Sequence, residues 1–470
     1  MSGSLLVAGT TSDAGKSVVT TGLCRALARR GISVAPYKAQ NMSNNSMVVS
    51  TGSTQGWDFG EIGRAQWVQA VAARATPEVA MNPVLLKPGS DRRSHVVLMG
   101  EPFGTLDAGE FAGGRTALRD AAWAAYDDLR ARYDVVVCEG AGSPAEINLR
   151  ATDYVNMGLA QHGRIPTVVV GDIDRGGVFA AMYGTLALLS DEDQSLIAGW
   201  VINKFRGDRS LLEPGLEMLR ARTNRPVYGV LPWLPDLWLD SEDALAILDR
   251  GSRPIPGERL KVAVVRLPRI SNFTDVDALC VEPSVDVWFA DGPRGLAGAD
   301  VVLLPGTRAT MADLAWMQKR GLADAVVAHA RAGGAVLGIC GGFQMLGTRV
   351  EDPAGVEGGG TVEGLGLLDV VTTFGADKVL RLPEHGYEIH HGRITHGDDE
   401  RWLGGARRGS VFGTMWHGAL ESDDVRRSWL ESVGGHSTAS FPAAREARIE
   451  ALADAVEEHL DVSALLELVS

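Results

Sequence analysis

The 470-residue chain contains only four cysteines, no run of 18 apolar residues and no excess of basic side chains. The cysteines lie far apart and form no CxxC pair, so we expect a reduced, cytoplasmic enzyme rather than a disulfide scaffold or a zinc site. Because no apolar run is long enough to cross a bilayer, we expect no transmembrane helix. The net charge of −14 argues against a nucleic-acid or anionic-membrane surface. We therefore predict no nucleic-acid partner and no membrane partner, and nothing in the sequence fixes the oligomeric state.

The order of apolar runs predicts an α/β fold with two doubly wound domains. In the first half, short β-rich runs alternate with helical stretches, which is the pattern of a parallel sheet covered on both faces. A second series of the same kind begins at Leu260, after a proline-rich, acidic stretch. We predict a first domain at 1–240, a linker at 241–258, a second domain at 259–435 and a C-terminal packing helix at 440–470. The expected strands are 5–8, 32–36, 134–138, 166–170, 196–202, 226–230, 260–265, 300–304, 335–339 and 410–416, and the Gly-rich stretch 352–366 is expected to be a loop.

A glycine-bounded loop follows the first expected strand, where residues 9–17 read Gly-Thr-Thr-Ser-Asp-Ala-Gly-Lys-Ser. In a phosphate-binding loop, backbone N–H groups converge on phosphate oxygens at a helix N-terminus. We assign Gly15, Lys16 and Ser17 to ATP, with Lys16 on the β- and γ-phosphates and the Ser17 hydroxyl on Mg²⁺. Five residues separate Gly9 from Gly15 where the usual pattern has four, and the strand–loop–helix context offsets that departure. The alternative is a glycine turn beside a solvated lysine.

An acid from a neighbouring strand end is expected to approach the same metal ion. Glu139 directly follows an apolar run and is the first candidate, and Glu61 is the second. Lys38, at the end of the expected strand 32–36, could add a positive charge beside the triphosphate, although a surface lysine is an equally good interpretation.

Acidic and basic side chains also follow the expected strand 166–170. Asp172, Asp174 and Arg175 lie between glycines at a strand end, where open α/β sheets bind ligands. We interpret this stretch as a catalytic or metal-linked loop, with a plain acidic turn as the alternative.

The second domain carries a cysteine at the junction of a strand and a helix. Cys340 follows the apolar run 335–339 and precedes Gly341 and Gly342, so it is predicted to lie on a sharp elbow that holds the thiol exposed, with helix N-terminal amides directed at it. Such amides favour a thiolate and can hold an oxyanion. We predict Cys340 as the nucleophile, and the backbone N–H groups of Gly341 and Gly306 as the oxyanion donors. A buried, inert thiol is the alternative, and it is our interpretation of the other three cysteines, Cys24, Cys138 and Cys280.

A cysteine hydrolase needs a base, which is commonly histidine. Among ten histidines, His417 is favoured because it follows a late expected strand and precedes Gly418. His385, His390, His391 and His396 form a cluster along the chain, but their spacing matches no strong metal-ligand pattern.

Taken together, the motifs resemble those of the cobyric acid synthases, glutamine-dependent amidotransferases of cobalamin biosynthesis. The matching stretches are residues 9–17, 38–43, 61–66, 82–88, 171–179, 201–208, 338–347 and 386–390. The resemblance implies a dethiobiotin-synthetase-like ATPase followed by a class I, triad-type glutaminase. ATP would activate carboxylates of adenosylcobyrinic acid a,c-diamide, with glutamine as the ammonia donor. Amidation at positions b, d, e and g would then give cobyric acid.

Two departures and two rival functions accompany this resemblance. Many triad glutaminases carry Glu two residues after the histidine, where this chain has Ala419, so the carboxylate partner of His417 is open and Glu421 is a guess. The segment 49–59 is longer than the family norm, and its role is open.

The related cobyrinic acid a,c-diamide synthase is the nearest rival function. A non-catalytic nucleotide switch is the other, but it leaves Cys340 and His417 without a purpose.

Overall fold

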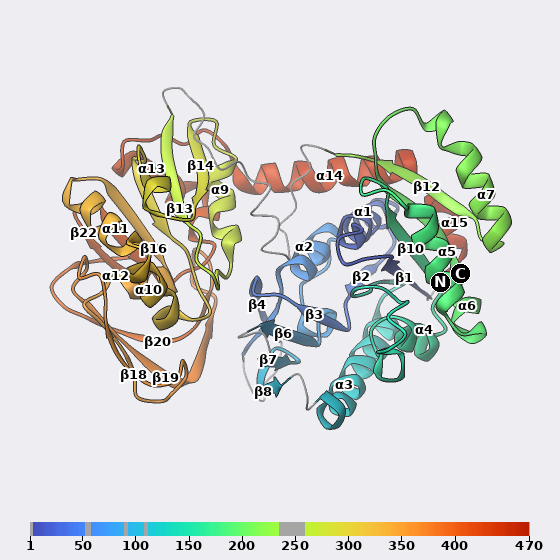
Figure 1. Ribbon diagram of the computed structural model, residues 1–470, viewed down its shortest axis with the longest axis horizontal. Coiled ribbons are helices and arrows are strands. Elements are labelled where there is room, and N and C mark those ends of the chain that lie inside the picture. The colour runs from blue at the N-terminus through green and yellow to red at the C-terminus, as the bar shows by residue number, and fades with distance from the viewer. Residues whose placement is uncertain (1–2, 52–57, 89–92, 108–110, 235–258, 470) are drawn as a thin grey trace. The chain divides into compact units, whose positions relative to one another are not determined.

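The chain divides into two compact units, and the computed structural model describes residues 3–51, 58–88, 93–107, 111–234 and 259–469 (Figure 1). Unit 1 comprises Met1–Met42, Val49–Leu239 and Glu446–Ser470, and unit 2 comprises Ser43–Val48 and Asp240–Arg445. The predicted linker at 241–258 lies outside the described residues. The chain therefore passes from one unit to the other at several points, and the predicted linker accounts for only one of them.

Unit 1 is built on a six-stranded parallel sheet with the strand order β12-β11-β10-β1-β9-β2. Side chains alternate across β1, so Leu6 enters one hydrophobic cluster while Leu5 and Val7 enter a second cluster on the opposite face. All six strands match runs expected from the sequence. They are β1 (Gly3–Gly9), β2 (Val34–Tyr37), β9 (Val135–Glu139), β10 (Thr167–Asp172), β11 (Ile197–Phe205) and β12 (Val227–Pro232).

Helices cover both faces of this sheet, as a doubly wound fold requires. The cluster that contains Leu6 is closed by α3 (Phe111–Arg132), α4 (Met157–Gly163), α5 (Val178–Leu188) and α7 (Glu213–Thr223). The opposite cluster is closed by α1 (Lys16–Arg29), α14 (Phe441–His459) and α15 (Val462–Glu467). Helix α2 (Arg64–Ala72) contributes to both clusters, and α6 (Asp191–Leu196) leads into β11.

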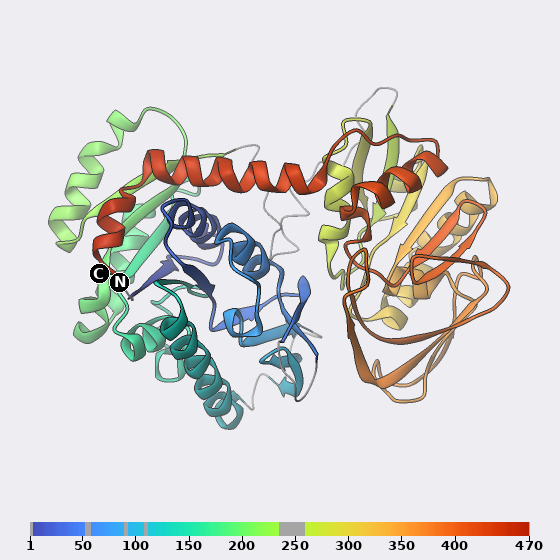
Figure 2. The ribbon, with the colours of Figure 1, turned by 180° about the vertical axis from the view of Figure 1, so that it is seen from behind.

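The C-terminal segment differs from the single separate helix that we expected at 440–470. It forms two helices, α14 and α15, and from Glu446 onward it belongs to unit 1. Ile449, Val456 and Leu465 enter the same cluster as α1. Figure 2 shows the red helices of this segment alongside the dark blue α1. The buried Arg25 of α1 donates to Glu446 Oε1 (2.5 Å) and, through Nε, to the carbonyl oxygen of Ala72 (2.7 Å). This segment is therefore part of the core of unit 1.

A small accessory sheet in unit 1 was not anticipated. Its order is β3-β6-β7-β8, formed by β3 (Gln40–Met42), β6 (Val84–Pro88), β7 (Arg93–Leu98) and β8 (Glu101–Asp107). Strands β4 (Ser46–Ser50) and β5 (Phe59–Gly63) form a separate two-stranded sheet. Residues 52–57 of the unusual segment 49–59 lie outside the described residues.

Unit 2 has a seven-stranded sheet with the order β14-β13-β15-β16-β23-β22-β21. The strands from β14 to β23 are parallel, and β22 and β21 are antiparallel additions. They are β13 (Leu260–Val265), β14 (Val285–Ala290), β15 (Val301–Leu304), β16 (Ala335–Ile339), β21 (Glu400–Trp402), β22 (Gly405–Arg408) and β23 (Val411–Thr414). Between residues 259 and 440, this unit contains α9 (Asp277–Cys280), α10 (Thr310–Lys319), α11 (Leu322–Arg331), α12 (Gly341–Leu346) and α13 (Asp423–Ser432).

A second sheet in unit 2 corrects the loop expected at 352–366. Its order is β18-β17-β19-β20, from β17 (Arg349–Asp352), β18 (Gly360–Glu363), β19 (Val370–Arg381) and β20 (Glu388–His396). Strand β18 lies inside the expected loop. The glycines there shape the turn before β18, where Asp352 accepts the N–H groups of Val356, Glu357 and Gly359.

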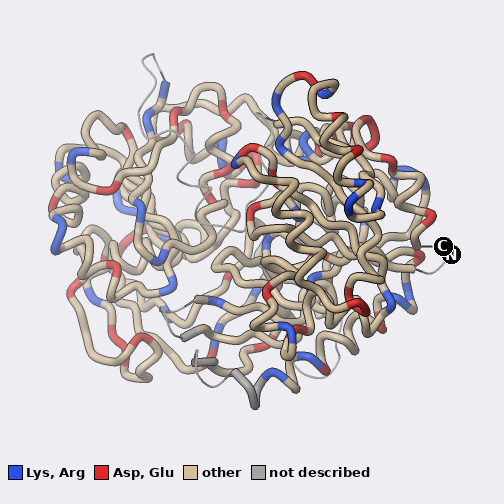
Figure 3. The backbone as a smooth tube through the Cα atoms, turned by 45° about the vertical axis from the view of Figure 1, so that its right-hand side comes forward, with Lys and Arg blue, Asp and Glu red and all other residues tan. Residues whose placement is uncertain are grey.

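Basic and acidic residues are interspersed along the backbone of each unit (Figure 3). Across the described residues, no helix is both long enough and apolar enough to cross a membrane.

Candidate active sites

Cys340 lies on the strained elbow between β16 and α12. Its backbone has φ 51° and ψ −108°, an unfavourable conformation for a residue with a side chain, and its N–H donates to the carbonyl oxygen of Thr414 (2.7 Å). Gly342 is required because a Cβ there would lie 2.0 Å from the carbonyl oxygen of Leu304. The elbow therefore packs against the end of β15 and places the thiol beside the N-terminus of α12, as predicted. The thiol is nevertheless buried, at 6% exposure, and not exposed as expected, because β15 and the loop after it pack against the elbow.

His417 follows β23 and is held between two other elements. Its backbone N–H and C=O exchange hydrogen bonds with Tyr387, and both distances are 2.9 Å. The Tyr387 ring stacks on the imidazole with ring centroids 5.5 Å apart. On the other side, His417 Nδ1 lies 2.7 Å from Asp275 Oδ2, and the second oxygen of Asp275 accepts the N–H of Gly418 (2.8 Å). The position and orientation of the imidazole are thus fixed from both sides.

The three side chains Cys340, His417 and Asp275 form a hydrogen-bonded series. Burial disfavours the imidazolium, but the carboxylate of Asp275 and the sulfur of Cys340, which is hydrogen-bonded to His417, together raise the pKa of His417 to about 10. His417 is therefore protonated near neutral pH and places a positive charge beside the sulfur of Cys340. This arrangement suits nucleophilic attack followed by proton donation to a leaving group.

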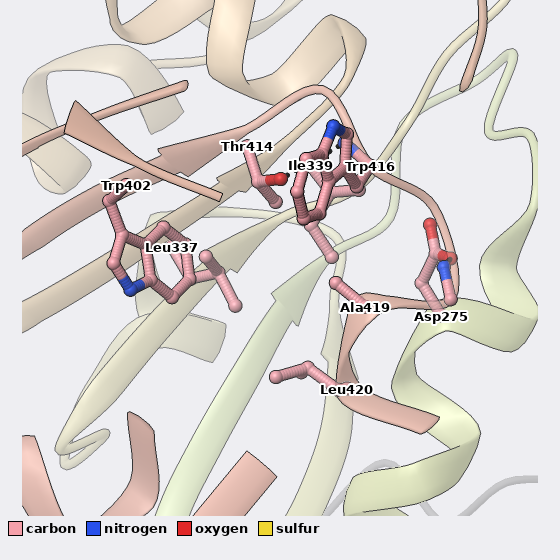
Figure 4. A pocket seen from close by; sticks show the side chains of 9 residues that line it. Asp275, Leu337, Ile339, Trp402, Thr414, Trp416, Ala419 and Leu420 are labelled. Atoms are coloured by element: carbon pink, nitrogen blue, oxygen red, sulfur yellow. Dashed lines mark hydrogen bonds between the residues drawn. The ribbon is translucent and has the colours of Figure 1, made fainter. Parts of the chain in front are cut away.

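Asp275 is the carboxylate partner that the sequence left open. It lies in the turn Phe273–Val276, 142 residues before His417, so no local spacing could reveal it. Ala419 and Asp275 line the same cavity of about 10 Å³ (Figure 4). The carboxylate that contacts His417 therefore comes from the turn Phe273–Val276, and not from position 419, where many triad glutaminases carry Glu. Glu421, our earlier guess, forms an ion pair with Arg445 (2.7 Å).

The predicted oxyanion glycines both lie beside this series. A Cβ on Gly306 would come within 2.8 Å of His417 Cε1, and one on Gly341 within 3.1 Å of the backbone nitrogen of Thr307. The loop after β15 therefore lies close to both the elbow and the imidazole. A side chain at Gly306 would crowd His417, and one at Gly341 would crowd Thr307 of this loop.

The remaining cysteines and histidines have other environments. Cys24 and Cys138 are fully buried, and burial raises the pKa of each thiol well above its ordinary value, as expected for inert core residues. Cys280 is exposed, which corrects its assignment to the core. Burial lowers the pKa of His390 to about 3 and that of His391 to about 4, and the described residues contain no group of three or more possible metal ligands.

In unit 1, the phosphate-binding loop joins β1 to α1 as predicted. Gly15 has φ 97°, and a Cβ there would lie 2.0 Å from Asn203 Nδ2. Lys16 Nζ donates to the carbonyl oxygens of Thr11 (2.9 Å), Ser12 (3.0 Å) and Gly142 (3.2 Å). Its ammonium group therefore lies over the loop, where a phosphate would meet it.

Ser17, Glu139 and Lys38 meet at one buried point. The Ser17 hydroxyl and Lys38 Nζ each donate to Glu139 Oε1 at 2.9 Å, and Gln69 Nε2 donates to Oε2 at 2.5 Å. Burial alone would raise the pKa of Glu139, but Lys38, Gln69 and Lys16 lower it below its ordinary value. Glu139 is consequently a carboxylate, and its pairing with a hydroxyl suits a hard cation such as Mg²⁺.

Glu61 has a different partner from the one we expected. It lies in β5 and forms a buried ion pair with Lys87 of β6. Glu139 is also paired with a buried lysine, Lys38, but it contacts Ser17 as well, so it stays the first candidate. The metal role of Glu61 stays a prediction.

The loop after β10 lies against the phosphate-binding loop. Arg175 forms an ion pair with Asp13 of that loop. Asp172 accepts from Lys204 Nζ (2.7 Å), which also donates to the carbonyl oxygen of Asp13 (2.8 Å). Asp174 pairs with Arg206 (3.2 Å). Asn203 and Lys204 lie in the motif at 201–208, so the sequence singled out this stretch without assigning it a contact.

A cavity of about 380 Å³ lies in unit 1 beside the phosphate-binding loop. Ser12 and Gly142 form one part of its wall, and Arg115, Arg150 and Tyr154 form another. It adjoins residues that Lys16 contacts. This cavity is the candidate site for a second substrate next to the nucleotide.

Comparison with known proteins agrees with this two-site description. Residues 5–246 match the profile described as the CobQ/CobB/MinD/ParA nucleotide binding domain, and residues 261–425 match the CobB/CobQ-like glutamine amidotransferase domain. Proteins named cobyric acid synthase are 68% identical in Mycolicibacterium vanbaalenii and 66% identical in Mycolicibacterium gilvum, each over 99% of this chain and 96% of the relative. The Mycobacterium tuberculosis protein of that name is 64% identical over 100% of this chain and 97% of the relative.

The chain belongs to the cobyric acid synthase family. As a member, it is an enzyme of cobalamin biosynthesis, a glutamine amidotransferase that uses ATP and glutamine. The resemblance inferred from the motifs and the two-domain α/β fold are confirmed. A solved glutamine amidotransferase structure is 20% identical and covers 37% of this chain and 98% of its own, with a TM-score of 0.30, and it adds nothing to this conclusion.

Proposed function

We propose that the protein amidates the b, d, e and g carboxylates of adenosylcobyrinic acid a,c-diamide to give cobyric acid, with ATP, Mg²⁺ and glutamine, in the cytoplasm. The observation that carries the glutaminase half is the buried series Cys340–His417–Asp275. The names of the relatives, and four cysteines that form no disulfide, support the remainder.

The glutaminase half begins with attack of the Cys340 thiolate on the carboxamide carbon of glutamine. The N–H groups of Gly341 and Gly306 stabilise the oxyanion that develops. The His417 imidazolium gives its proton to the departing ammonia, which leaves a thioester on Cys340. Neutral His417 then accepts a proton from water as the water hydrolyses the thioester, and glutamate is released. Asp275 holds the imidazole in the orientation that both steps need.

The synthetase half activates a carboxylate that is otherwise a poor acyl donor. A carboxylate oxygen of the corrinoid attacks the γ-phosphorus of ATP, giving an acyl phosphate and ADP, and ammonia then displaces phosphate to form the amide. Lys16 and Lys38 stabilise charge on the transferring phosphoryl group. Ser17 and Glu139 would hold Mg²⁺, which neutralises phosphate charge when bound.

The cavity beside Ser12 and Gly142 is where we propose that the corrinoid carboxylate arm enters. Its wall contains Arg115 and Arg150, and guanidinium groups recognise carboxylates. Asp172, Asp174 and Arg175 are proposed to order the phosphate-binding loop from its other side, because Asp172 and Arg175 contact it through Lys204 and Asp13.

The decisive experiment follows the corrinoid by mass spectrometry. The protein is incubated with adenosylcobyrinic acid a,c-diamide, ATP, Mg²⁺ and either glutamine or ammonium, beside a Cys340→Ala variant. We expect stepwise conversion of four carboxylates, lost in the variant with glutamine and restored by ammonium. An active glutaminase that leaves this corrinoid unchanged but amidates cobyrinic acid would assign the protein to the rival reaction.

A further inference from the structure

Six residues from the N-terminal half of the chain belong to the glutaminase unit. Ser43–Val48 lies in unit 2, although Met42 before it and Val49 after it lie in unit 1. The sequence motif at 38–43 leads directly into this segment, and the proposed reaction leaves the segment without a role.

Two asparagines join this segment to the turn that carries Asp275. Asn45 Oδ1 accepts the backbone N–H of Phe273 (3.2 Å), and Asn272 Oδ1 accepts the backbone N–H of Ser46 (2.8 Å). Each asparagine side chain thus accepts a hydrogen bond from the backbone N–H of the residue that follows the other asparagine. Asn45, Ser46, Asn272 and Phe273 are all buried, at 2%, 0%, 3% and 1% exposure, so water cannot replace these bonds.

The bonds are formed where the turn begins. Asn272 has φ 49°, a left-handed conformation that asparagine tolerates better than most residues with a side chain. The turn Phe273–Val276 follows directly, and its Asp275 is linked to the nucleophile Cys340 through His417. Asp275 binds His417 and Gly418, and His417 is hydrogen-bonded to Cys340.

We propose that Asn45 is a positioning residue of the glutaminase: with Asn272, it fixes the Phe273–Val276 turn and so holds Asp275 against His417. The proposal rests on the glutaminase assignment made above. It gives the N-terminal half of the chain a part in glutamine hydrolysis, separate from its part in nucleotide chemistry.

The test compares two activities of the full-length chain, glutamate release from glutamine and ammonium-dependent amidation. Asn45→Ala should lower kcat for glutamate release by about 10- to 100-fold, because small displacements of catalytic groups are costly. KM for glutamine should change less, and the alkaline limb of the kcat profile should move to lower pH as Asp275 loses its hold on His417. Ammonium-dependent amidation should stay within about twofold of the wild type.

Two further variants separate positioning from general damage. Asn272→Gly keeps the left-handed backbone but removes the acceptor for Ser46, so it should reproduce the Asn45→Ala phenotype. The double variant should be little worse than either single variant, because both bonds fix one turn. Asn44→Ala is the matched control, since the adjacent Asn44 Oδ1 accepts no hydrogen bond, and it should behave as wild type.

Three outcomes would overturn the proposal. Full glutaminase activity in Asn45→Ala would show that the bond is not needed. An equal fall of glutaminase and ammonium-dependent activities would show general structural damage, as would an Asn44→Ala variant with the same defect. A wild-type protein that releases no glutamate from glutamine would instead overturn the proposed function, and this inference with it.

Discussion

At the scale of single residues, the charge on His417 depends on one carboxylate. Burial alone would keep the imidazole neutral, yet its pKa is about 10 because Asp275 and Cys340 lie beside it. The buried carboxylate therefore sets both the orientation of the base and its protonation state.

Asp275→Asn should lower kcat for glutamine hydrolysis by about 10²- to 10⁴-fold, because His417 loses its ionic partner and the neutral amide permits the wrong tautomer. Glutamate release is the measurement, and ammonium-dependent amidation should be unaffected. An Asp275→Asn variant with normal hydrolysis would contradict the assignment.

The same pair makes stability depend on pH. The pKa of His417 is raised from its ordinary 6.5 to about 10. Its stabilising contribution is therefore fully present below pH 6.5 and is lost as the pH rises through about 10. Denaturant unfolding of wild type and Asp275→Asn should differ most at acidic to neutral pH and converge toward about pH 10. A difference that grows with pH would contradict this account.

The third residue-scale prediction concerns the proposed Mg²⁺ site. Glu139→Gln removes the carboxylate beside Ser17, so the Mg²⁺ concentration for half-maximal ATP turnover should rise by about 10- to 100-fold. Glu61→Gln is the matched control, because its carboxylate pairs with Lys87. It should lower stability while leaving the Mg²⁺ requirement unchanged. An increased requirement in Glu61→Gln would instead assign the metal role to Glu61.

At the scale of elements, the C-terminal helices complete the ATPase core. Ile449, on α14, is 1% exposed and lies in the same cluster as Leu23 of α1. Ile449→Ala should lower the free energy of unfolding of unit 1 by about 2–5 kcal/mol, because it leaves a cavity. Glu458→Ala, on the exposed side of the same helix, is the control and should have almost no effect. Denaturant unfolding measures both, and equal effects would contradict the packing described.

The elements that the sequence predicted are those with the strongest local signals. Buried parallel strands such as β1 and β16 are continuous apolar runs that end at a glycine loop or elbow, so both the strands and Lys16, Ser17 and Cys340 at their ends could be located. Short strands such as β3 and β18 are defined by their partners and carry no such run. Asp275 and Asn45 were missed for the same reason, since their partners are 142 and 228 residues away in sequence.

At the scale of the whole molecule, each unit has its own parallel sheet and its own buried strands. We therefore expect calorimetry to resolve two unfolding transitions. A non-hydrolysable ATP analogue with Mg²⁺ should raise only the transition of unit 1, because it binds the folded form of that unit. Ile449→Ala identifies this transition independently by lowering it. A single transition that responds to both changes would contradict separate folding of the units.

The return of residues 446–470 to unit 1 has a consequence for synthesis on the ribosome, where the chain emerges from its N-terminus. Residues 43–48 are already outside when 240–445 emerge, so every part of the glutaminase unit is present by then. The ATPase unit starts first but lacks Ile449, Val456 and Leu465 until the last segment is released. The part of one apolar face that α14 and α15 cover thus stays open until this segment is released, and the unit begun first is the one finished last.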